Sequence, residues 1–104
     1  MPWLNLRDVL PTDECLGEIA DVRQKYSRFN EIWAGIVWLF AREPEPEGSF
    51  ESVVHEGVRY LIYGFRGDAA AGIPDMWIFY GYDEKQVRIH GINANDAAED
   101  EEEG

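Results

Sequence analysis

Hydrophobic residues along this chain recur with two periods, one typical of helices and the other of strands. In the first third, Leu16, Ile19, Tyr26 and Phe29 recur at helical spacing. Thr12 precedes them as a suitable N-cap, and acidic residues at positions 13 and 14 favour a helix start because the helix dipole stabilises anions there. We therefore expect a first helix from residue 13 to about residue 28.

A second helical pattern follows at once. Its apolar stripe consists of Ile32, Trp33, Ile36, Val37 and Phe40, after a possible cap at Asn30. Two prolines and a glycine between residues 44 and 48 end this helix, because proline lacks the amide donor that a helix interior needs. The short segment between the two patterns allows either one bent helix or a hairpin of two.

The second half of the chain has the pattern of strands. Four runs rich in β-branched and aromatic residues are separated by short polar turns, which favours antiparallel neighbours. In the last run, Val87 and Ile89 alternate with Arg88 and His90, so one sheet face is predicted to be core and the other polar. The predicted strands are residues 50–55, 58–65, 76–80 and 87–92, and residues 1–11 either add a short strand or anchor the chain.

The order of elements predicts one α+β domain over residues 1–95, followed by a disordered acidic tail over residues 96–104. The chain has 104 residues and a formal net charge of -12. The tail holds six acidic residues and no basic one, which leaves 15 acidic and nine basic residues in the domain. Such a charge does not attract nucleic acid or anionic membranes through its overall field.

The remaining composition indicates a cytoplasmic protein. Cys15 is the single cysteine and has no partner within the chain for a disulfide. The first residues lack the basic segment and long apolar run of a secretory signal, and no apolar stretch is long enough to span a membrane. The histidines and Cys15 show no recognisable metal-ligand spacing, so we expect neither a metal nor a cofactor. Cys15 itself is expected to be a packed thiol.

The segment of residues 31–45, with an arginine and a proline just after a helix, is similar to part of the RelE/ParE-type toxins. Residues 58–63 resemble a strand of those toxins, and residues 77–84 and 86–92 resemble their last two strands. The resemblance covers about residues 30–93. It implies two N-terminal helices packed on a curled, mainly antiparallel sheet of three to five strands, and an antitoxin partner that wraps the domain.

The resemblance also implies an activity and a site. RelE-like members cleave messenger RNA on the ribosome without a metal, and ParE-like members act on DNA gyrase instead. A ribonuclease of this kind would use polar side chains on the sheet to deprotonate a ribose 2'-hydroxyl and to stabilise charge at phosphorus. The candidate catalytic residues are Arg59, Arg66, Tyr82, Arg88 and His90. This chain differs from those toxins in being acidic and in having an acidic tail at its C-terminus.

Other interpretations of the same residues stay open. Arg88 and His90 are also compatible with an ordinary solvated sheet face. Trp38 lies off the helical stripe and either packs at the sheet edge or serves as an exposed anchor for a partner. The alternative function is a non-enzymatic acidic interaction module that binds a basic protein partner or mimics nucleic acid, and a homodimer is compatible with either function.

Overall fold

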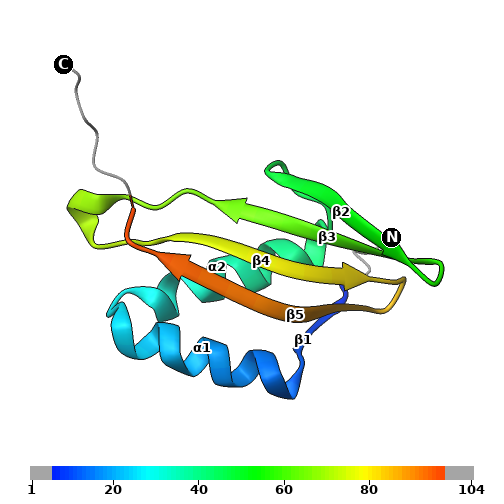
Figure 1. The fold of residues 1–104 in the computed structure, drawn as a ribbon, viewed down its shortest axis with the longest axis horizontal. Helices are drawn as coiled ribbons and strands as arrows, with labels where there is room; N and C mark the ends of the chain where they lie inside the picture. Colours follow the sequence, from blue (N-terminus) through cyan, green and yellow to red (C-terminus); the bar gives the residue numbers. More distant parts are fainter. Residues whose placement is uncertain (1–5, 98–104) are drawn as a thin grey trace.

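A computed structural model of the protein describes residues 6–97. Two helices and five strands follow the order that the sequence predicted (Figure 1). The elements are β1 (Asp8–Pro11), α1 (Asp13–Lys25), α2 (Phe29–Arg42), β2 (Ser49–His55), β3 (Val58–Phe65), a short 3-10 turn (Ala69–Ala71), β4 (Asp75–Tyr82) and β5 (Gln86–Asn95). Both helices lie on the same side of the sheet.

The five strands form one mixed sheet with the order β1-β5-β4-β3-β2. Strands β2 to β5 pair antiparallel, and β1 pairs parallel to β5 through Asp8 to Pro11. The expectation of a mainly antiparallel sheet is confirmed, and β3 and β4 lie inside the sheet and not at its edges. The first eleven residues contribute a strand, although positions 1–5 lie outside the described residues.

The sheet is not strongly curled, and in this respect the expected shape is wrong. Strong curvature in a sheet needs bulges or glycine kinks at several positions. The described pairings have one register shift between β2 and β3 and one between β4 and β5. Two short helices cover such a sheet without needing it to wrap around them.

The two helical patterns form separate helices. Tyr26 ends α1 in an extended conformation, and its amide bonds the carbonyl oxygen of Val22. The chain then turns back, and α2 begins at Phe29, one residue before the predicted cap Asn30. The Thr12 hydroxyl accepts a hydrogen bond from the Cys15 amide at 3.2 Å, which confirms Thr12 as the cap of α1.

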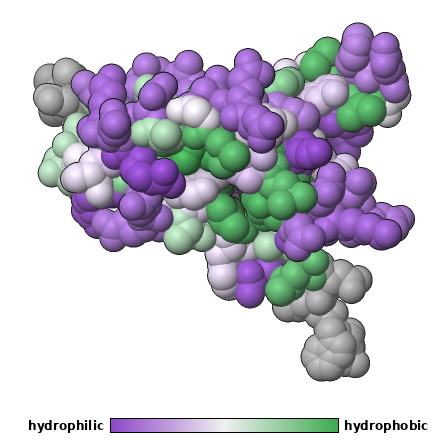
Figure 2. All heavy atoms as spheres, turned by 90° about the horizontal axis from the view of Figure 1, so that it is seen from below, coloured by the Kyte–Doolittle hydropathy of each residue, from purple (hydrophilic) through white to green (hydrophobic). Residues whose placement is uncertain are grey.

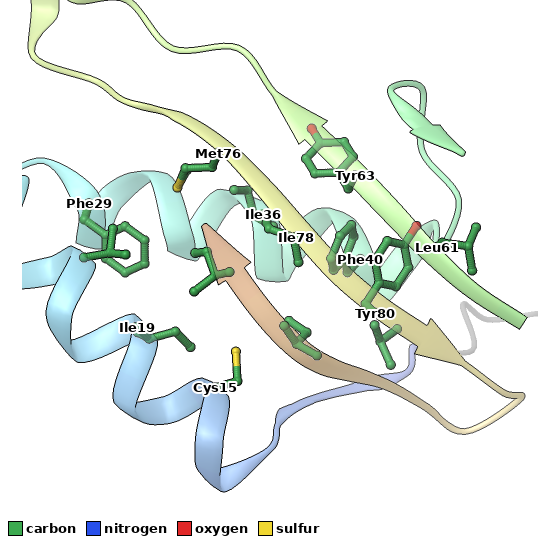
Figure 3. Close-up of a cluster of buried hydrophobic side chains, with 14 residues drawn as sticks. Cys15, Ile19, Phe29, Ile36, Phe40, Leu61, Tyr63, Met76, Ile78 and Tyr80 are labelled. Atoms are coloured by element: carbon green, nitrogen blue, oxygen red, sulfur yellow. The ribbon is translucent and has the colours of Figure 1, made fainter. Parts of the chain in front are cut away.

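The core lies between the helices and one face of the sheet (Figure 3). Phe40 of α2 stacks on Tyr80 of β4 at 4.5 Å between ring centroids and meets Tyr63 of β3 edge-on at 5.4 Å. Cys15 is fully buried, and burial, followed by the charge of Glu18, raises the pKa of its thiol to about 11. Cys15 is therefore a protonated, packed thiol at neutral pH.

The loop between α2 and β2 is fixed to the sheet by polar contacts. The Tyr80 hydroxyl donates to the Pro44 carbonyl oxygen at 2.7 Å, and the Ser49 hydroxyl donates to that of Pro46 at 2.5 Å. The Gly64 amide of β3 donates to the Gly48 carbonyl oxygen at 3.0 Å. These bonds satisfy buried groups at the end of the core, so the loop is part of the fold.

The side of the molecule on which α1 lies is mostly hydrophilic. Figure 2, which views the structure from below, shows hydrophilic side chains over most of this surface and a hydrophobic patch near its middle. The charged residues of α1 include Asp13, Glu14, Asp21 and Arg23, all of them exposed. The outward surface of α1 thus contributes to the acidic character of the protein.

Replacing Phe40 by alanine should lower the free energy of unfolding by about 3–5 kcal/mol, because a fully buried aromatic ring is removed from the centre of the core. Trp38→Ala, two residues earlier on the same helix, is the matched control. Trp38 is 57% exposed, so that substitution should change the free energy by about 0.5 kcal/mol or less. Urea denaturation followed by circular dichroism measures both values, and equal losses would contradict the assigned core.

Candidate functional site

The face of the sheet that the helices do not cover is unusually apolar. It is called the open face here. Strand alternation and the pairing registers direct to it a set of side chains from β2 to β5. They are Phe50, Val53, Val58, Tyr60, Ile62, Trp77, Phe79, Arg88 and His90.

The exposed hydrophobic residues are concentrated on this face. Nine large hydrophobic side chains are exposed among the described residues, and five of them belong to the open face. These five are Leu10 of β1, Phe50, Val53, Val58 and Trp77, with exposed fractions between 40% and 55%. Large contiguous apolar patches on a protein surface mark interaction sites more often than single exposed residues do.

An aromatic cluster forms the centre of the open face. Tyr60 of β3 stacks on Phe79 of β4 with ring centroids 5.4 Å apart. The His90 ring meets Tyr60 edge-on at 5.4 Å and lies 5.9 Å from the Phe79 ring. The three rings come from three adjacent strands, so the pairing registers hold them together.

A groove of about 550 Å³ lies beside this cluster. Its floor contains Gly81, where an added Cβ would lie 3.1 Å from the Arg59 carbonyl oxygen. Side chains of the open face line it, among them Val58, Tyr60, Gln86, Arg88 and His90. A smaller hollow of about 270 Å³ lies next to it along the same face and includes Ile62, Trp77 and Phe79.

The ionisable residues that line the groove include Arg59, Asp83, Arg88 and His90. Arg88 is exposed and forms no ion pair with any residue from 6 to 97. Burial, and then the charge of Arg88, lowers the pKa of the His90 imidazole. His90 is therefore neutral at pH 7, and its imidazole, which can accept a proton, lies in the groove with Arg88, which has no ion pair among the described residues.

Arg59 and Tyr82 also border the groove, but strand alternation directs their side chains to the helix side of the sheet. The Arg59 guanidinium bonds the Glu45 carboxylate at 3.0 Å and the Glu51 carboxylate at 3.3 Å. The Tyr82 hydroxyl also donates to Glu45, and this bond, together with that of Arg59, lowers the pKa of the Glu45 carboxyl. Both side chains are thus engaged in fixing the loop between α2 and β2.

Arg66 lies away from the other candidates. It is exposed and follows the C-terminal end of β3, whereas the groove lies at the N-terminal end of that strand. Seven residues along a strand separate Arg59 from Arg66, which corresponds to about 23 Å. Four of the five candidates therefore border one groove, and Arg66 lies apart from it. Arg59 and Tyr82 are bound to Glu45, whereas Arg88 and His90 belong to the open face.

Tyr60, Phe79 and Trp77 were not among the predicted site residues. Strands β3 and β4 are apolar at nearly every position, so the sequence does not show which of their two faces the helices cover. The polar alternation of β5 was the available signal, since residues paired with Arg88 and His90 share their face.

Trp38 is exposed on α2, and the Arg42 guanidinium lies 4.0 Å from the centroid of its ring.

Two structural features bear on cofactors and membranes. Among residues 6–97, no three His, Cys, Asp or Glu side chains are grouped closely enough to hold a metal ion. No helix within the same range has the length and apolar character needed to cross a membrane.

Comparison with known proteins found no matching family model, no similar curated protein and no similar solved structure.

The lowered pKa of His90 can be tested by removing the neighbouring charge. In Arg88→Gln, the pKa of His90 should rise, because one of the two causes of its lowering is absent. Lys85→Gln removes an equal charge from the adjacent turn and should change this pKa less. Histidine proton resonances followed against pH by NMR measure both variants, and an unchanged pKa in Arg88→Gln would contradict the geometry.

The same group makes stability depend on pH. His90 binds its proton less readily in the folded protein than in the unfolded chain. Its full contribution to the free energy of unfolding is therefore present above the ordinary histidine pKa of about 6.5. That contribution is lost as the pH falls through the lowered pKa that His90 has in the folded protein.

Proposed function

We propose that this protein is a non-enzymatic interaction domain whose open face is covered by a partner protein. The observation that carries the proposal is the uncovered aromatic and aliphatic surface opposite the helices, with Trp77, Phe50 and Val58 each at least 44% exposed. A sheet that is apolar on both faces is normally covered on both. Aromatic residues and arginine also contribute most to binding energy in protein interfaces, and this face presents both.

The arrangement of the candidate catalytic residues also supports a binding role. Arg59 and Tyr82 are held by Glu45 on the far side of the sheet, and Arg66 is at the other end of β3. An active site for RNA cleavage needs several of these groups around one phosphate. Of the four candidates that border the groove, Arg88 and His90 alone belong to the open face, and they are suited to recognition of a charged partner group.

Site-specific photocrosslinking tests this proposal. A photoreactive phenylalanine analogue replaces Trp77 on the open face in one variant, and Trp38 on α2 in the matched control. Expressed in its native cells, the Trp77 variant should form a discrete crosslinked product with another protein, and the Trp38 variant should not. Crosslinks from position 38 alone, or from neither position, would contradict the proposal.

A second candidate function is a toxin of RelE/ParE type with ribonuclease activity, and one observation favours it. The groove places a neutral imidazole beside an arginine without an ion partner. There His90 would take the proton of a ribose 2'-hydroxyl, whose oxygen attacks phosphorus and expels the 5'-oxygen of the next nucleotide. Arg88 would stabilise the charge at phosphorus, and the Tyr60 hydroxyl would protonate the leaving oxygen.

Controlled expression separates the two candidates. The ribonuclease predicts growth arrest with loss of messenger RNA, relieved by His90→Ala and by Arg88→Ala but not by Arg59→Ala, because Arg59 is held on the other side of the sheet. Growth arrest without RNA loss would point instead to a gyrase-directed toxin. The interaction domain predicts no arrest, with intact RNA in all four strains.

A further inference from the structure

We infer that the partner element which covers the open face is an amphipathic helix of a basic protein, with a carboxylate of that helix against Arg88. This inference rests on the proposed interaction function and specifies the chemistry of the partner.

The apolar character of the open face excludes a single extended segment as its cover. A lone strand laid across Tyr60, Phe79 and Trp77 would bury its own amides and carbonyls without partners, at a cost of several kcal/mol per group in the worst case. An α-helix satisfies these groups internally, as α1 and α2 do on the other face. A helix can therefore cover this surface. An extended segment would instead pair with the edge strand β2, where its backbone groups find partners.

The charge of the protein selects a basic partner. The net charge is -12, and acidic residues surround the open face at Asp8, Glu56, Asp75 and Glu84. A second copy of this chain and a nucleic acid would both bring negative charge to this surface, and like charges raise the free energy of association. A positively charged partner is attracted at long range and is stabilised at the rim of the contact.

Arg88 defines the polar contact inside this interface. Asp83 borders the same groove, but its carboxylate accepts hydrogen bonds from the amides of Lys85 and Gln86. Asp8 lies on the neighbouring strand β1, and Arg88 forms an ion pair with neither carboxylate in the described structure. Because Arg88 forms no ion pair with residues 6–97, its guanidinium would lose water when the face is covered, and a partner group that replaces this water stabilises the contact. An aspartate or glutamate on the docked helix supplies that partner through a charge-assisted hydrogen bond.

The size of the surface bounds the docked helix. Val58 and Gly64, the residue paired with Trp77, mark the length of the apolar surface along β3, six residues or about 20 Å. At 1.5 Å per residue this corresponds to about 13 helical residues, or three to four turns. The partner helix should therefore present apolar residues at spacings of three and four over this length, with basic residues on its other positions.

Selection from a peptide library tests the inference. Phage-displayed 15-residue peptides of helix-favouring composition are selected against the full chain and, in parallel, against its Arg88→Glu variant. Against the wild type, the enriched peptides should be basic and amphipathic, with one recurrent acidic position. Against Arg88→Glu, that position should become lysine or arginine.

The affinity of a wild-type-selected peptide provides the quantitative control. It should fall about tenfold or more for Arg88→Glu, since a charge pair becomes a charge repulsion. Arg23→Glu makes the same charge change on α1, away from the open face, and should not weaken binding. Equal losses for both variants would overturn the role of Arg88.

Two further outcomes separate failure of this inference from failure of the proposed function. Enriched peptides that are acidic, or that have the alternating pattern of a strand, would overturn the basic helix. If their binding is still lost in Trp77→Ser, the open face remains an interaction surface. Absence of any enriched peptide sensitive to Trp77→Ser would overturn both.

Discussion

The structure depends on burial of one face of the sheet by two short helices. Phe40, Ile36 and Phe29 of α2 and Ile19 and Cys15 of α1 all reach the same side, where Tyr80, Ile78 and Ile89 are fully buried. Two helices of 13 and 14 residues supply cover for one sheet face and no more. Because β3 and β4 are apolar on both of their faces, this arrangement leaves an equally hydrophobic surface without cover from the described chain.

Polar contacts are divided between the two sides of the sheet, and this division separates structural residues from candidates for binding. On the helix side, Glu45 joins Arg59 and Tyr82 and holds the loop that links α2 to β2. On the open face, Arg88 and His90 form no ion pair within the described residues, and His90 lies against the rings of Tyr60 and Phe79. Polar groups engaged by the fold are poor candidates for recognition, whereas Arg88 is available to a charged group from outside.

Local patterns predicted the elements well because their signals are short-range. The Thr12 cap, the Pro44 to Gly48 stop and the alternation of Val87 to His90 act within a few residues, and the strand from Val58 to Phe65 has the predicted bounds. Placing the candidate site needs the sheet register, which the sequence does not provide. Whether Arg59 shares a face with Arg88 depends on pairing between β3, β4 and β5, including a register shift near Tyr80 that no local pattern reports.

Carbene footprinting in native cells, compared with the purified protein, tests the central claim most directly. The account predicts that Trp77 and Phe79 are modified less in cells than in the purified protein, because a partner covers the open face. Trp38, exposed on the helix side, should be modified equally in both. Equal modification of Trp77 in cells and in isolation would contradict the claim that this face is an interaction surface.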